Sequence, residues 1–245
     1  MTTGQLKKTV IIAAVLIILF AMALRVNAPR ADLPSHLTFS GSILTDEGNQ
    51  CHNSRSKVLY GEWFPDDWRI TNYNPVLPWI KYTVFKIFGV GLTQLRLVNY
   101  IFAFLSLLFF FLTLRSYFRE NPNLALLGTF LLGINFFFVM YNKIGTFETS
   151  ITFWVVLTLY FLEKYRSSLE NPVKPNRPYL FLFLSGASAF MAFIFKSIMV
   201  YLLPLPFAAV VLVQFFGNTS GNRVSFPDHV KKLIKPVLII LAGIL

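Results

Sequence analysis

The residues best suited to chemistry are acidic side chains gathered in one segment, residues 25–96. Carboxylates can accept a proton from a substrate hydroxyl or bind a divalent cation. Six of the eleven acids of the chain lie in this segment: Asp32, Asp46, Glu47, Glu62, Asp66 and Asp67. A plain connector between two helices would not need so many charges. We therefore expect this segment to carry the chemistry of the protein.

The composition of the whole chain is too apolar for a soluble protein. Of its 245 residues, 55% are hydrophobic, 17% are aromatic and only 13% are charged. Glycine and proline are ordinary at 13 each, which excludes a collagen-like chain. Cys51 is the single cysteine, so no intrachain disulfide can form and a disulfide framework is excluded. The composition predicts a membrane protein.

Apolar stretches of about 20 residues, enough to cross a bilayer, recur along the sequence. They lie at residues 9–24, 97–114, 124–141, 146–162, 179–195 and 198–216. A seventh opens at Pro236 and is incomplete, so we expect either a fragment of a longer chain, which we favour, or a partly inserted segment. The first stretch could be a signal peptide cleaved near Ala21-Met22-Ala23, but its length favours a retained span.

Positive charges predict the orientation, because Lys and Arg in short loops stay on the cytoplasmic side. With the N-terminus inside, the short outer loops contain only Lys143 and Lys196. The inner loops contain the larger basic set: Lys7, Lys8, Arg115, Arg119, Lys164, Arg166, Lys174, Arg177, Arg223, Lys231, Lys232 and Lys235. Residues 25–96 then form a long first extracytoplasmic loop of a multi-pass protein in the plasma (inner) membrane. Topology, rather than nucleic-acid binding, explains most of the net charge of +11.

Two short helices are expected inside the long outer loop. One covers residues 49–60, after Asp46 and Glu47. The other covers residues 77–88 and is apolar at Leu77, Ile80, Val84 and Ile87, with Lys81 and Lys86 elsewhere around its axis. This pattern is typical of a helix that lies on the bilayer surface.

Short motifs in and beyond this loop resemble a known family. They are Thr45-Asp46-Glu47-Gly48, Gly61-Glu62-Trp63, Tyr73-Asn74-Pro75, Phe88-Gly89 with Arg96, and residues 141–148. Their order resembles the polytopic GT-C glycosyltransferases, most of all the family 39 branch of protein O-mannosyltransferases and lipid A aminoarabinose transferases. The resemblance runs from about Lys7 to Phe216. It implies an all-α transmembrane bundle with short interfacial helices in its first outer loop, and a C-terminal part that is missing here.

The resemblance also implies a reaction and a general base. The enzymes of this family move a sugar from a polyprenyl phosphate to a hydroxyl group of a protein or lipid. Asp46 matches the acid that accepts the hydroxyl proton, and Glu47 is the second acid, which holds the acceptor or tunes Asp46. A single displacement inverts the anomeric centre and needs no carboxylate nucleophile. A solvated acidic turn is the structural alternative for both residues.

The leaving phosphate of such a donor requires positive charge. The candidates are Arg55, Arg69, Lys81 and Arg96, of which Arg96 matches the family pattern best. The alternative interpretation of Arg96 is that it is an ordinary basic residue at a helix end. Relatives in the aminoarabinose branch often have Lys before the Pro where this chain has Asn74. A phosphate ligand expected at that position is therefore missing.

Glu148 matches a second-loop acid that helps to bind a divalent metal in some GT-C enzymes. With Asp46 it could form an oxygen site for Mg²⁺ or Mn²⁺, and His52 could join it. The alternative is that Glu148 stabilises the N-terminus of the following helix.

Two other classes of function stay open on the sequence. One is a lipid or sugar transporter or flippase with a broken helix at Pro204 and Pro206, although the predicted spans are nearly free of charge, which argues against ion coupling. The other is an inactive, truncated fragment that binds lipid. No motif for a soluble cofactor is present.

Overall fold

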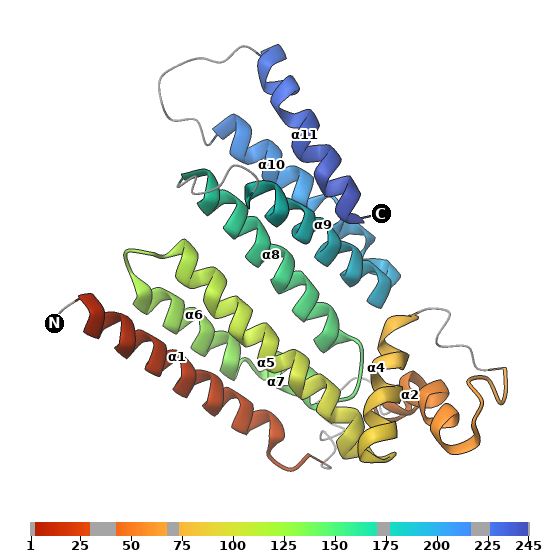
Figure 1. Ribbon diagram of the computed structural model, residues 1–245. Coiled ribbons are helices and arrows are strands. Elements are labelled where there is room, and N and C mark those ends of the chain that lie inside the picture. The colour runs from red at the N-terminus through yellow and green to blue at the C-terminus, as the bar shows by residue number, and fades with distance from the viewer. Residues whose placement is uncertain (1–2, 30–42, 68–73, 171–176, 217–225, 245) are drawn as a thin grey trace. The chain divides into compact units, whose positions relative to one another are not determined.

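The computed structural model describes residues 3–29, 43–67, 74–170, 177–216 and 226–244, and all regular structure in them is helical (Figure 1). The predicted all-α polytopic fold class is confirmed. The chain forms two compact units. The first contains Met1–Phe153 with Ile194–Lys196, and the second contains Trp154–Phe193 with Ser197–Leu245. Each unit is described by itself below.

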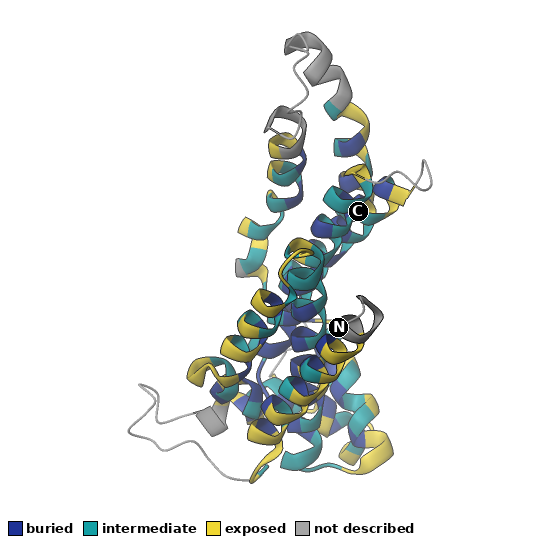
Figure 2. Cartoon of the chain, turned by 90° about the vertical axis from the view of Figure 1, so that its left-hand side faces the viewer, coloured by how far each residue is buried: buried dark blue, intermediate teal, exposed yellow. Residues whose placement is uncertain are grey.

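The first unit is a bundle built around α1 (Thr3–Val26), α5 (Leu92–Tyr117) and α6 (Pro122–Ile134), which all pack against one another. The buried face of α1 presents Val10, Ala14, Ile18 and Ala21, which recur every three or four residues and so share one side of the helix. The opposite side exposes large apolar residues, and such stripes of exposed residues are visible in Figure 2. Apolar surface on that side is expected where lipid replaces water.

Among the described residues, three single helices are long and apolar enough to cross a membrane: Lys8–Val26, Leu92–Tyr117 and Arg177–Phe195. They correspond to three of the predicted spans. The predicted span at 124–141 is divided between α6 and α7 (Phe136–Lys143), which are bent by 56° at a break and together are apolar enough for a broken span or a re-entrant loop. Asn135 lies at this break, and its side-chain oxygen accepts a hydrogen bond from the Phe138 amide at 3.0 Å, which caps α7.

The remaining predicted spans differ from the observed helices. α8 (Glu148–Glu170) extends beyond residue 162, and the stretch at 198–216 divides into a 3₁₀ helix, Ser197–Leu202, and α10 (Leu205–Phe216). Pro204 lies at that division, since it cannot donate a backbone hydrogen bond. α11 (Phe226–Ile244) contains Pro236 in its interior, so the helix that holds the predicted incomplete span begins before that span.

The second unit packs α9 (Arg177–Phe195) closely against α11. Its core contains Tyr165, Leu182, Val210 and Ile240. A Cβ atom on Gly186 would lie 2.6 Å from the carbonyl oxygen of Ile240, so only glycine allows this approach. Small residues at helix contacts are the usual means of close packing in membrane bundles.

Two shorter helices, α2 (Ile43–Tyr60) and α4 (Val76–Phe88), pack against each other in the first unit. Figure 1 shows them at the end of the bundle where α1 ends and α5 begins. They are the predicted helices of the long loop, but α2 begins six residues earlier than the expected position 49. Asp46 and Glu47 therefore lie inside a helix rather than before one.

Candidate active site

Asp46 and Glu47 are neighbours in α2, yet their side chains have opposite environments. Consecutive residues of a helix point about 100° apart, so Asp46 is exposed while Glu47 is only 1% exposed. Asp46 lies in the first turn of α2, where the helix dipole favours a negative charge. Among the described residues no hydrogen-bond partner is found for the Asp46 carboxylate.

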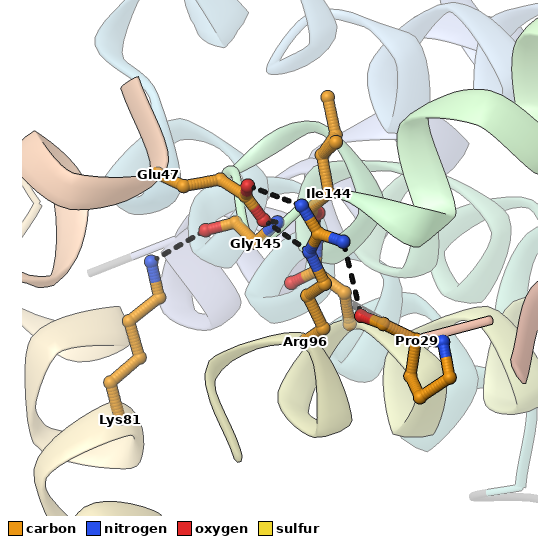
Figure 3. Close-up of polar contacts among 7 residues, drawn as sticks. Pro29, Glu47, Lys81, Arg96, Ile144 and Gly145 are labelled. Atoms are coloured by element: carbon orange, nitrogen blue, oxygen red, sulfur yellow. Dashed lines mark hydrogen bonds and ion pairs between the residues drawn. The ribbon is translucent and has the colours of Figure 1, made fainter. Parts of the chain in front are cut away.

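Glu47 forms a bidentate ion pair with Arg96 of α5 (Figure 3). Arg96 Nε donates to Glu47 Oε1 at 2.8 Å, and Arg96 Nη2 donates to Glu47 Oε2 at 2.7 Å. Arg96 Nη1 also donates to the carbonyl oxygen of Pro29 at 3.0 Å. Both charged side chains are buried, so each satisfies the other where water cannot. The pair fixes the first turns of α2 to the beginning of α5.

Gly145, in the connection between α7 and α8, is held by residues of the first loop (Figure 3). Its backbone N–H donates to Glu47 Oε1, and its carbonyl oxygen accepts a hydrogen bond from Lys81 Nζ at 2.9 Å. A Cβ atom at this position would lie 2.5 Å from the Leu95 side chain and 3.2 Å from Glu47 Oε1. Only glycine fits between these neighbours.

The orientation of α4 differs from the prediction. Leu77, Lys81 and Phe85 form its buried face, whereas Trp79 and Ile87 are 56% and 66% exposed. Lys81 was expected away from the packed face, but its ammonium group reaches two backbone carbonyls there. Burial lowers the pKa of Lys81 to about 8. The hydrogen bonds from Lys81 to these carbonyls thus hold α4 in an orientation that its apolar residues alone do not predict.

The four predicted phosphate-binding residues have different environments. Arg55 of α2 is exposed, whereas Lys81 and Arg96 are buried with the partners given above. Arg69 lies outside the described residues. Asn74, at the position where the resemblance implies a lysine, is also buried: it donates to the carbonyl oxygen of Phe195 at 2.6 Å and accepts from the Leu77 amide at 3.1 Å. Asn74 therefore anchors the start of α4.

A cavity of about 310 Å³ lies beside Glu47. Apolar side chains dominate its wall, including Phe85 and Leu95, and the exposed Arg55 also lines it. Cys51 contributes its thiol, whose pKa is raised by burial. An apolar chamber next to one exposed cation suits a molecule with a hydrocarbon chain and an anionic group.

Glu148 is the first residue of α8, as a carboxylate that stabilises a helix N-terminus should be. One of its oxygens accepts a hydrogen bond from Lys196 Nζ at 2.9 Å. His52 instead pairs with Asp66 at 2.8 Å. In the part of the chain that the structure describes, no group of three or more His, Cys, Asp or Glu side chains could hold a metal ion.

A second buried polar network lies at the same end of the first unit. Arg25 is fully buried at the end of α1, where its Nε donates to Asn142 Oδ1 at 2.8 Å. Asn142 donates in turn to Thr149 Oγ1 at 3.1 Å, which also accepts from Asn99 at 3.2 Å. These residues were not singled out as part of a site from the sequence. The available signal was polar side chains at the ends of apolar stretches.

A comparison with protein-family models matches residues 72–242 to the dolichyl-phosphate-mannose-protein mannosyltransferase family. The matched region includes Lys81, Arg96, Gly145 and Glu148, and it begins after Asp46 and Glu47. No curated protein and no solved structure gives a significant match. The family match covers well over half of the chain, and the helical bundle agrees with it. The chain is a multi-pass membrane protein that belongs to the dolichyl-phosphate-mannose-protein mannosyltransferase family, a GT-C glycosyltransferase family.

Proposed function

We propose that this protein transfers a sugar from a polyprenyl phosphate to a hydroxyl group of a protein or lipid on the extracytoplasmic face of the membrane. The family name points to mannose as the first sugar to try. The observation that carries the proposal is the contrast within α2: Asp46 is exposed while the adjacent Glu47 is locked by Arg96. A carboxylate on a rigid support is what base catalysis needs.

The proposed reaction is one displacement at the anomeric carbon. The Asp46 carboxylate accepts the hydroxyl proton while the hydroxyl oxygen bonds to the anomeric carbon. The bond from that carbon to the phosphate oxygen breaks, and polyprenyl phosphate leaves with the bonding electrons. The anomeric configuration inverts, because the oxygen enters opposite the leaving group. A positioned base of this kind contributes about 10²- to 10⁴-fold to the rate.

Arg55 and the cavity beside it support a lipid-linked donor. Arg55 offers an exposed guanidinium for the phosphate, and the apolar wall offers a place for part of the isoprenoid chain. Arg69 stays a candidate for the same role. The proposed reaction implies three partners for the protein: the lipid-linked sugar, the bilayer and the hydroxyl acceptor.

Metal ions take no part in the proposed steps. Asp46 is open, but one Glu148 oxygen accepts a hydrogen bond from Lys196, so a Mg²⁺ or Mn²⁺ ion between these two acids would compete with that ammonium group for Glu148. Two carboxylates from separate elements with one already paired fit a divalent site poorly.

The experiment is a donor comparison with the purified chain in liposomes. We expect label to move from synthetic polyprenyl-phosphate mannose to a serine- or threonine-containing peptide or to a lipid acceptor, and not from a nucleotide-linked mannose. Protein-free liposomes provide the background. Sugar uptake without covalent product would indicate a transporter instead, and donor binding without any product would indicate a lipid-binding fragment.

A further inference from the structure

Lys81 is the only one of the four phosphate candidates that is a lysine, and its environment does not resemble that of a ligand-binding group. The side chain is 0% exposed on the buried face of α4. Its ammonium donates to the carbonyl oxygens of Gly145 at 2.9 Å and Gln50 at 3.3 Å. It also lies 5.9 Å from the centre of the Phe147 ring. Among the described residues no carboxylate lies within ion-pair distance of it.

These contacts join three separate parts of the first unit. Gln50 belongs to α2, Lys81 to α4 and Gly145 to the connection that leads into α8. The same glycine donates its N–H to Glu47 of α2. Residues of α2 and α4 thus hold Gly145 at its N–H and at its C=O. A backbone segment held at both groups has little freedom to shift.

The held segment lies between the first turn of α2, which carries Asp46, and the first residue of α8, Glu148. Asp46 precedes Glu47 directly, and Glu148 follows Gly145 by three residues. If the connection moved, the first turns of α2 and α8 would move relative to each other. An error of about 1 Å in such geometry can lower a rate by about 10²-fold.

We propose that Lys81 is a positioning residue, which holds the Gly145 to Glu148 segment against α2 and thereby sets the geometry around Asp46, and that it does not contact the donor phosphate. The inference rests on the proposed transfer reaction for its kinetic consequences, but its structural part can be measured without turnover. Lys81 uses its donors on protein carbonyls, and Arg55 is left as the exposed cation of α2 beside the cavity.

The test replaces Lys81 with methionine, which keeps a long unbranched chain and removes the donors. Lys86→Met is the matched control, because Lys86 is an exposed lysine of the same helix, 5.7 Å from the Tyr82 ring centre. Hydrogen exchange of residues 144–148 is measured first. We expect at least tenfold faster exchange in Lys81→Met and no change in Lys86→Met. Unchanged exchange in Lys81→Met would overturn the proposal, whether or not the chain transfers sugar.

Kinetics then separate positioning from phosphate binding. We expect kcat to fall by about tenfold or more in Lys81→Met, within the range for a misplaced group. The donor KM and the inhibition constant of free polyprenyl phosphate should stay within about twofold of wild type. A rise of tenfold in both constants with an unchanged kcat would show that Lys81 binds the phosphate and would overturn the proposal.

Amine labelling of the wild-type protein decides the question if Lys81→Met does not fold. A positioning residue that is buried should stay unmodified both with and without polyprenyl phosphate, while Lys86 is modified in both conditions. Ready modification of Lys81 in the absence of lipid, with protection in its presence, would contradict the proposal. This measurement needs neither a variant nor catalysis.

Discussion

Asp46→Asn is expected to lower kcat by about 10²- to 10⁴-fold while the protein stays folded. Asparagine keeps the size of the side chain but cannot accept the hydroxyl proton at neutral pH. The folded state should tolerate the change, because Asp46 is exposed and its loss removes only a helix-dipole contribution of about 0.3–1 kcal/mol. The measurement is the initial rate of transfer from a defined lipid-linked sugar.

Asp67→Asn is the matched control for this result. Asp67 is another exposed acid of the same loop and lies outside α2. Its replacement should leave kcat within about twofold of wild type, since surface changes away from a site have small effects. Undiminished turnover in Asp46→Asn would show that another group, or no group, acts as the base.

Arg96→Met is expected to have the largest effect on stability. It removes the bidentate partner of Glu47 and leaves a carboxylate that is 1% exposed with the Gly145 N–H as its remaining hydrogen bond. Breaking a buried ion pair in this way costs about 3–5 kcal/mol. We expect a marked fall in the temperature at which half of the detergent-solubilised protein stays monodisperse, or loss of expression.

Two further variants show whether the effect comes from the unpaired charge. Glu47→Gln combined with Arg96→Met removes both charges, so the double variant should be more stable than Arg96→Met alone. Arg119→Met removes an exposed arginine just beyond the C-terminal end of α5 and should change stability little. A double variant as unstable as the single one would mean that Arg96 acts through packing rather than through the charge of Glu47.

The sequence predicts the helical bundle well, because apolar length is the property that a bilayer selects. α5 and α9 contain the predicted stretches 97–114 and 179–195 almost as expected. The break at Asn135 was missed, because an apolar run does not reveal where a helix bends, whereas a broken helix at Pro204 and Pro206 was one of the alternatives that the prolines indicate. Only the three-dimensional structure shows that the Asn135 side chain caps a new helix.

The different environments of the two candidate acids could not be predicted from the sequence. The helix was expected to begin at residue 49, after Asp46 and Glu47, whereas α2 begins at Ile43 and turns one acid outward and the other inward. Lys81 could not be placed from the pattern, since a lysine on an apolar helix ordinarily lies at the surface. Its burial depends on carbonyl groups of Gln50 and Gly145 that are distant in sequence.

The anomeric configuration of the transferred sugar is the most direct test of the central claim that one loop carboxylate activates a hydroxyl for direct attack on a lipid-linked donor. A synthetic polyprenyl-phosphate sugar of known configuration is turned over by the wild-type protein, and the linkage in the product is read by nuclear magnetic resonance. The predicted product has the opposite configuration at the anomeric carbon. A product with the configuration of the donor would show that the hydroxyl oxygen did not enter opposite the leaving phosphate, and it would contradict the single direct displacement assisted by Asp46.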